Sequence, residues 1–214
     1  RVFFWAGIDK KNCYLELVIW AFGYYQKIKK DFKNIDIAIN NVGHGILKPL
    51  IDFTEEDFDR SININLKSLW LSLKNQIPVM TADTSNKKHI INVASINGLG
   101  GAEYLSLYAA AKAGVISMTK SAALEHSKSN ISINAIAPGP FETPMLKDAL
   151  NVQAGGNREK QNAIEEQYKQ MIPKGRFGRP EEFAEAILWL CQGKSTYLSG
   201  HSLIMDGGLT SRFR

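Results

Sequence analysis

The stretch "HIINVASINGLGGAEYLSLYAAAKAG", residues 89–114, decides the fold. It begins with the apolar run "HIINVAS" at 89–95, which is typical of a strand buried on both faces. It ends in a segment that is apolar on nearly every side, and we expect a buried or interfacial helix over residues 105–126. Apolar strands that alternate with helices indicate a parallel sheet with helices on both faces.

The same alternation continues on both sides of this stretch. Further apolar strands are predicted at "IDIAI" (35–39), "ISINAIA" (131–137) and "HSLIMD" (201–206). Thr54 with Asp57 resembles a capping box, which opens helical material that runs towards Pro78. Pro180 suits the first turn of a helix over "EEFAEAILWL", and residues 140–175 read as an irregular excursion with some helix. The pattern predicts one α/β domain.

Composition and charge exclude several classes of function. The 214 residues are 44% hydrophobic and 22% charged, which is ordinary for a soluble globular chain. The net charge of +5 is spread without a dense basic run, so no nucleic-acid partner is expected. Cys13 and Cys191 make no disulfide framework, which fits a reducing cytoplasm. Glu16 interrupts the longest apolar stretch, so no membrane span is expected.

Polar residues and glycines follow three of the predicted strands. "NNVG" (40–43) follows the first, Ser95 ends the second, and "PGPFET" (138–143) follows the third. Because ligands of parallel sheets bind beyond the carboxyl ends of the strands, these residues are predicted to share one site.

Tyr108 and Lys112 are four residues apart, one turn along the predicted helix. An ammonium beside a phenol favours the phenolate, so the spacing predicts a lowered pKa for Tyr108. The same spacing in Tyr25 and Lys29 is a decoy, because only Tyr108 has a strand-end serine thirteen residues before it. The alternative interpretation is that Tyr108 is a core aromatic and Ser95 a turn residue.

Several motifs in the same order resemble the short-chain dehydrogenase/reductase family, over roughly residues 27–210. They are "NNVG" (40–43), "NINLKSLW" (63–70), "NVAS" (92–95), "YAAAK" (108–112), "NAIAPGPFETPM" (134–145), "GRFGRPEE" (175–182) and "MDGG" (205–208). The resemblance implies a Rossmann-type doubly wound sheet, NAD or NADP as cofactor, and a homo-tetramer or homo-dimer. No metal-binding residues are predicted.

The resemblance also implies roles for individual residues. Tyr108 would be the general acid or base, and Ser95 would hold the substrate oxygen. Lys112 would lower the pKa of Tyr108 and bind the ribose hydroxyls next to the nicotinamide. Asn65, rather than its neighbour Asn63, would orient a water that links Lys112 to solvent.

Further residues would bind the cofactor. The implied cofactor-binding set is Asn40, Asn41, Gly43, Tyr108, Lys112, Pro138, Gly139, Phe141 and Thr143. Thr143 and the Phe141 amide would bind the carboxamide, while Asn40 has the alternative role of bracing the sheet. The glycines of "NGLGG" (97–101) do not complete a G-x-G-x-x-G motif and read as a flexible wall of the substrate pocket.

The chain departs from the family pattern near its N-terminus. The expected glycine-rich phosphate turn is missing from residues 1–39, where Gly7 and Gly23 cannot build it. We therefore expect an N-terminally truncated Rossmann domain without its first strands, with an atypical segment at 1–26 and the rest of the domain at 27–214. The strand at 35–39 would then have an unpaired edge, unless "VFFWAGI" (2–8) fills it.

The predicted function is NAD(P)-dependent interconversion of a secondary alcohol and a ketone in the cytoplasm. The substrate is predicted to be either a sugar or cyclic alcohol, or a 3-oxoacyl thioester. The alternative is a truncated, non-catalytic fragment or scaffold that lacks the cofactor phosphate site. A basic binding module is the third and least favoured hypothesis.

Overall fold

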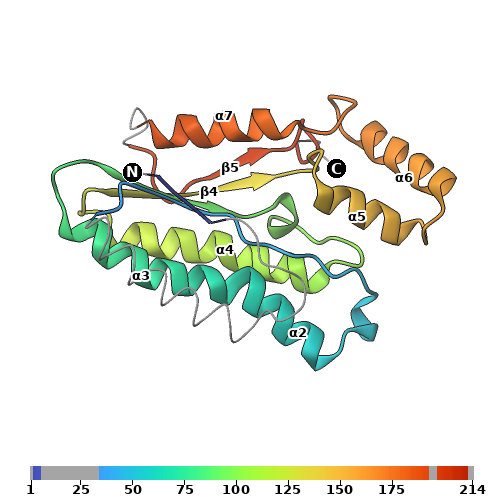
Figure 1. Ribbon diagram of the computed structural model, residues 1–214, viewed down its shortest axis with the longest axis horizontal. Helices are drawn as coiled ribbons and strands as arrows, with labels where there is room; N and C mark the ends of the chain where they lie inside the picture. Colours follow the sequence, from blue (N-terminus) through green and yellow to red (C-terminus); the bar gives the residue numbers. More distant parts are fainter. Residues whose placement is uncertain (1, 6–33, 193–196, 212–214) are drawn as a thin grey trace.

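The structure is a computed structural model that describes residues 2–5, 34–192 and 197–211. Within these residues a parallel sheet of five strands lies at the centre, and the strands follow one another in chain order (Figure 1). The strands are β1 (Val2–Trp5), β2 (Ile37–Asn40), β3 (Lys88–Val93), β4 (Ile131–Pro138) and β5 (Ser202–Met205). The predicted parallel sheet is confirmed.

Helices cover both faces of this sheet. The long helices are α2 (Glu55–Ile62), α3 (Ser68–Ala82), α4 (Ser106–Glu125), α5 (Pro144–Gln153), α6 (Arg158–Met171) and α7 (Pro180–Cys191). Shorter turns are η1 (Leu50–Asp52), the π-helical η2 (Asn63–Lys67) and η3 (Ile96–Gly98). Helices α3 and α4 lie on one face and α7 on the other (Figure 1), so the sheet is doubly wound as predicted. None of the helices in the described residues is both long and apolar enough to span a membrane.

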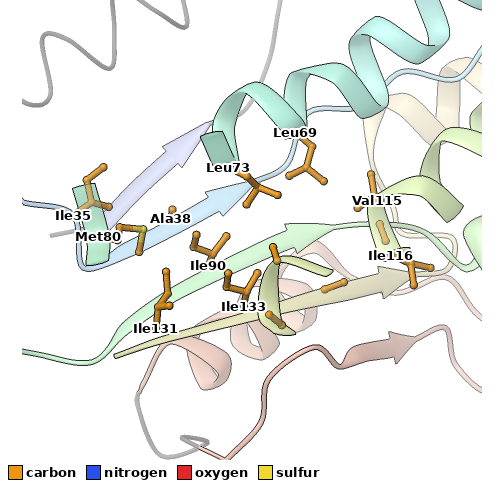
Figure 2. Packing of buried hydrophobic residues seen from close by; sticks show 14 of the residues in the cluster. Ile35, Ala38, Leu69, Leu73, Met80, Ile90, Val115, Ile116, Ile131 and Ile133 are labelled. Carbon is orange, nitrogen blue, oxygen red and sulfur yellow. The ribbon is translucent and has the colours of Figure 1, made fainter. Parts of the chain in front are cut away.

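The two faces of the sheet bury separate apolar cores. On one face, Leu73 of α3 and Val115 of α4 pack over Ile90 and Ile133 of the central strands (Figure 2). On the other face, Ile187 of α7 belongs to a cluster with side chains of β2, β3 and β4. These clusters explain why the strands read as continuous apolar runs, because alternate residues of each strand face different helices.

Strand β1 settles whether "VFFWAGI" fills the edge beside β2. Val2 pairs with Ile37 and Trp5 pairs with Asn40 in a parallel register, so the edge of β2 on this side is covered. The prediction of an unpaired edge at this position is therefore wrong.

Two of the predicted helix starts are confirmed, and two other expectations about helices differ from the structure. Thr54 forms the capping box, and Pro180 is the first residue of α7. However, α3 continues through Pro78 and ends at Ala82. The excursion at 140–175 is more helical than expected, since it contains α5 and α6 joined by a turn with Gly155 and Gly156 at positive φ.

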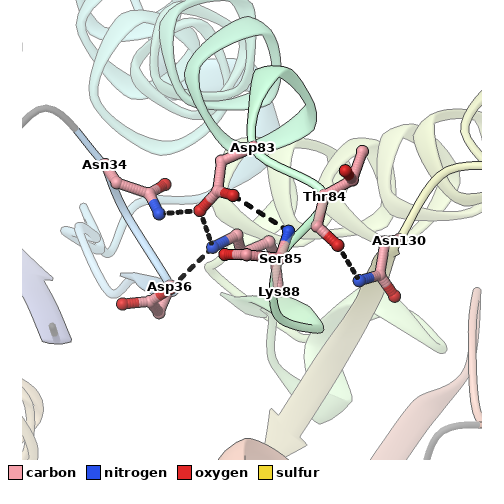
Figure 3. Close-up of polar contacts among 7 residues, drawn as sticks. All are labelled: Asn34, Asp36, Asp83, Thr84, Ser85, Lys88 and Asn130. Atoms are coloured by element: carbon pink, nitrogen blue, oxygen red, sulfur yellow. Dashed lines mark hydrogen bonds and ion pairs between the residues drawn. The ribbon is translucent and has the colours of Figure 1, made fainter.

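A buried lysine joins three elements at the amino end of the sheet (Figure 3). Lys88 is 0% exposed, and its Nζ lies 2.7 Å from Asp36 Oδ1 and 2.8 Å from Asp83 Oδ2. Asn34 also donates a hydrogen bond to Asp83. The hydrogen bonds from Lys88 hold the pKa values of both aspartates below their usual range. This cluster is far along β3 from Ser95, so it serves the fold rather than the candidate site.

Candidate functional site

The residues predicted to share a site lie where β2, β3 and β4 end. "NNVG" begins with the last residue of β2, Ser95 follows β3 by two residues, and Pro138 is the last residue of β4. Because these strands are parallel, their carboxyl ends meet at one edge of the sheet. The backbone therefore brings the predicted segments together.

Ser95 is held by a tight turn that rests directly on α4. Its Oγ accepts a hydrogen bond of 3.2 Å from the Asn97 backbone N–H. A Cβ at Gly98 would lie 2.6 Å from the Lys112 carbonyl carbon and 2.7 Å from its oxygen. Glycine at 98 is thus what lets η3 touch the α4 backbone and places Ser95 beside that helix. Gly100 and Gly101 have open space around them, as expected of a loop wall, but the packing role of Gly98 was not predicted.

Tyr108 and Ser95 are brought together by this contact. The Ser95 hydroxyl lies close enough to the Tyr108 phenol to act on its pKa. Burial raises the pKa of Tyr108 above its ordinary value of 10.0, and the hydrogen bond with Ser95 offsets part of this increase. The lowered pKa predicted from the helical spacing is therefore wrong for the chain without ligand. The phenol keeps its proton at neutral pH.

Lys112 lies one turn further along α4 and is 3% exposed. Its Nζ donates hydrogen bonds to the Val93 carbonyl (2.8 Å) and to the Val42 carbonyl (3.4 Å). The same nitrogen lies 5.7 Å from the centre of the Tyr108 ring, so the two side chains share a face as predicted. Burial lowers the pKa of Lys112 to about 8, because neither of its carbonyl partners carries a full charge.

Asn65 clamps the loop that follows β2. Its Nδ2 donates to the backbone carbonyls of His44 and Ser61, both at 2.9 Å, and its Oδ1 accepts from the His44 N–H at 2.9 Å. Asn65 is 1% exposed and lies in the π-helical turn η2, a feature that is frequent at functional sites. Its neighbour Asn63 is partly exposed. The water-orienting role of Asn65 stays a prediction.

Asn40 braces the sheet. Its Nδ2 donates to Gln76 Oε1 (3.0 Å) and Asn92 Oδ1 (2.8 Å), and its Oδ1 accepts from Gln76 Nε2 (2.8 Å). Asn92 in turn donates to Thr119 Oγ1 at 3.0 Å. This chain of buried side chains ties β2 and β3 to α3 and α4, as the bracing alternative for Asn40 predicted, although its partners Gln76, Asn92 and Thr119 were not identified from the sequence. The side chain of Asn40 is thus structural, while Asn41 is partly exposed at the end of β2.

The segment after β4 is held by close backbone contacts. A Cβ at Gly139 would lie 2.8 Å from Asp206 Cβ, so Pro138 and Gly139 lie against the loop that follows β5. Phe141 forms a bridge with Gly178, and Thr143 caps α5 by accepting a hydrogen bond from the Leu146 N–H.

The nicotinamide end of a dinucleotide fits the residues at this edge. A Cβ at Gly43 would lie 3.2 Å from Lys112 Nζ and 3.4 Å from Asn65 Oδ1, so a side chain there would crowd both. Lys112 uses two of its three N–H donors on backbone carbonyls, which leaves one for a ribose hydroxyl. Gly7 and Gly23, which we considered for the phosphate turn, lie outside the described residues.

Comparisons with known proteins identify the family of the chain. A family model described as enoyl-(acyl-carrier-protein) reductase matches residues 23–210. The chain is 38% identical to 3-oxoacyl-[acyl-carrier-protein] reductase of Thermotoga maritima over 184 residues, which are 86% of this chain and 70% of that protein. The crystal structure of levodione reductase is similar with a TM-score of 0.84 and 30% identity, over 92% of this chain and 74% of the other.

A second similar solved structure has NADP bound. The structure titled "ElxO with NADP bound" has a TM-score of 0.81 and 29% identity, over 92% of this chain and 77% of the other. The matching family model, these relatives and the parallel doubly wound fold lead to one conclusion. The chain belongs to the short-chain dehydrogenase/reductase family of oxidoreductases.

Proposed function

We propose that this chain interconverts a secondary alcohol and a ketone, with NAD or NADP as the hydride carrier. The observation that carries the proposal is that the Ser95 hydroxyl lies beside the Tyr108 phenol and that the buried Lys112 is one turn away, with its Nζ 5.7 Å from the centre of the Tyr108 ring. Two neighbouring hydroxyls at the carboxyl edge of the sheet would both bond the same substrate oxygen, which supports the proposal.

Tyr108 suits the role of proton donor in ketone reduction. Its raised pKa keeps the phenol protonated at neutral pH. When a hydride reaches the carbonyl carbon, the oxygen gains negative charge and takes the Tyr108 proton, which completes the alcohol. Ser95 donates a hydrogen bond to that oxygen as its charge develops. In the reverse direction Tyr108 must first be a phenolate, a state that the nearby Lys112 ammonium favours, and this phenolate then takes the alcohol proton and becomes the phenol.

A bound nicotinamide would supply or accept the hydride. Lys112 would hold its ribose through the N–H that no carbonyl uses, and Thr143 with the Phe141 amide would hold the carboxamide. Asn65 would orient the water that returns protons from solvent to Lys112. These roles follow the family resemblance at residues that the fold brings to one edge.

The substrate belongs to one of two classes, a sugar or cyclic alcohol, or a 3-oxoacyl thioester. Helices α5 and α6 follow the segment that contains Thr143, so this pair of helices would form the wall that selects between them. We propose that the active form is a homo-dimer or homo-tetramer in the cytoplasm.

The decisive test is reduction of a panel of cyclic ketones and 3-oxoacyl thioesters by the 214-residue chain, followed by nicotinamide absorbance. Tyr108→Phe should lower kcat by at least about 10²-fold, because it removes the proton donor but keeps the ring. Tyr197→Phe is the matched control, since Tyr197 is fully exposed, and it should leave kcat unchanged. Equal rates for the wild type and Tyr108→Phe would remove the proposed mechanism.

The non-catalytic alternative makes a different prediction for cofactor binding. A scaffold without a phosphate site would bind neither NADH nor NADPH. A fluorescence titration of the chain with each cofactor therefore separates the two, and saturable binding together with turnover supports the enzyme.

A further inference from the structure

A small, partly open cavity lies behind the candidate site, between α3, α4 and the ends of β2 and β3. Its volume is about 10 Å³. Its apolar wall includes Leu69 of α3 and Val115 of α4, which both face the sheet in Figure 2. Its polar wall consists of Asn40, Asn65, Ser68 and Ser72. A polar wall is unusual for an empty cavity, because dry cavities in proteins are normally apolar.

Ser72 is the residue in this wall that needs a partner. It is 0% exposed, and its Oγ has no hydrogen-bond partner in the protein. Ser68, one turn earlier in the same helix, donates its hydroxyl to the Ile64 carbonyl at 2.5 Å, so its donor is satisfied. A buried hydroxyl that loses its hydrogen bonds to water without replacement costs free energy. Ser72 therefore points to a ligand that the protein atoms do not supply.

The cavity matches one water molecule in both size and chemistry. A volume of about 10–15 Å³ is the least that holds a water, which needs two to four polar partners. Asn40 Oδ1 accepts one hydrogen bond from Gln76, and Asn65 Oδ1 accepts one from the His44 N–H. Each amide oxygen therefore keeps a second lone pair. A water could donate to both oxygens and accept from the Ser72 hydroxyl.

We propose that this cavity binds one water molecule, which joins Ser72 to Asn40 and Asn65, and that Ser72 is thereby a positioning residue for Lys112. Lys112 is not among the residues that line the cavity. The site is thus separate from the water that would link Lys112 to solvent.

The coupling to Lys112 runs through the walls of the cavity. Val42 and Val93 line it, and their carbonyls are the two hydrogen-bond acceptors of Lys112 Nζ. On the other side, Asn40 connects the water to the amide chain that braces β2 and β3. Loss of the water would let these walls relax and would shift the carbonyls that hold the ammonium. This positioning role rests on the proposed function, whereas the water site itself does not.

The first test is structural and needs no activity. A high-resolution crystal structure of the wild type should show a water within hydrogen-bond distance of Ser72 Oγ, and Ser72→Val should lack it. Ser72→Ala should lower Tm, because the water loses a partner. Ser202→Ala is the matched control: its Oγ is also buried without a partner, but Ser202 does not line the cavity, so Tm should not fall. A dry cavity, with Ser72→Val and Ser72→Ala both as stable as the wild type or more so, would overturn the proposal.

The second test separates positioning from structure. In Ser72→Ala the alkaline limb of the pH profile of kcat/KM, which Lys112 sets, should move by at least half a pH unit, or about threefold in the ionisation constant. A water present in the crystal together with an unchanged limb would overturn the positioning role. If the wild type shows no turnover at all, the proposed function fails, and the crystal structure and Tm still decide the water site.

Discussion

Substitution of Gly98 by alanine tests the geometry of the site most directly. The new Cβ would lie 2.6 Å from the carbonyl carbon of Lys112, whereas ordinary van der Waals contact begins near 3.4 Å. The Cβ is fixed directly to the backbone of η3, and the carbonyl belongs to the backbone of α4, so no flexible side chain can move away to relieve the clash. The turn η3 and helix α4 must therefore separate by the difference, about 0.8 Å. Ser95 lies on one side of this contact and Tyr108 on the other.

The expected effects follow from that displacement. A shift of about 1 Å in a catalytic group can cost about 10²-fold in rate, so kcat/KM should fall by about 10- to 100-fold. Overpacking of this kind costs about 1–3 kcal/mol, and each kcal/mol lowers Tm by about 2–4 °C in a chain of this size.

Gly100→Ala provides the control in the same loop. A Cβ at Gly100 would have nothing within 4 Å, so both activity and Tm should stay near the wild-type values. Activity would be followed by nicotinamide absorbance and unfolding by circular dichroism. If Gly98→Ala behaves like Gly100→Ala, the contact between η3 and α4 does not position Ser95, and the account of the site given above is wrong.

Two predictions concern pH. For ketone reduction, kcat/KM should fall as pH rises above about 8, because the Lys112 ammonium is lost with a pKa of about 8 while Tyr108 is still protonated; a limb that first appears above pH ~10 would contradict this. At the other end of the sheet, Lys88 lowers the pKa of both flanking aspartates. The ionised aspartates therefore stabilise the fold fully above pH ~4, which is their pKa in the unfolded chain. This stabilisation is lost as pH falls through their lower pKa values in the folded chain. Lys88→Met should therefore have a lower Tm at neutral pH and a flatter acid limb in thermal melts, and an unchanged acid limb would show that the cluster does not stabilise the fold.

The sheet and the location of the site were predictable from local pattern. Each predicted strand differs from the observed one by at most two residues at either end. A run of apolar residues reports burial on both faces without reference to any distant residue. The polar residues at the strand ends then had to meet, because parallel strands share one carboxyl edge.

Features that depend on distant contacts were not predictable in the same way. Pro78 normally ends or kinks a helix, yet α3 continues to Ala82, and Met80 within this last turn is 0% exposed in the core. The burial of Met80 in the core favours continuation of the helix past Pro78. Lys88 reads in the sequence as one of several spread basic residues, but the fold buries it between aspartates 5 and 52 positions away. In the sequence, Gly98 suggests a flexible loop, whereas in the structure the backbone of α4 packs directly against it.

The pKa of Tyr108 shows where spacing stops being informative. A spacing of four residues in a helix places a phenol and an ammonium on one face. The structure confirms this, because Lys112 Nζ lies 5.7 Å from the centre of the Tyr108 ring. The spacing does not say where the ammonium makes its hydrogen bonds. Lys112 donates to carbonyls at the ends of two other segments, so its ammonium is held at the edge of the sheet. Burial then dominates both groups, raising the pKa of Tyr108 and lowering that of Lys112. The chain is thus prepared to donate a proton, whereas alcohol oxidation starts from a phenolate, which a nearby positive charge or a higher pH favours.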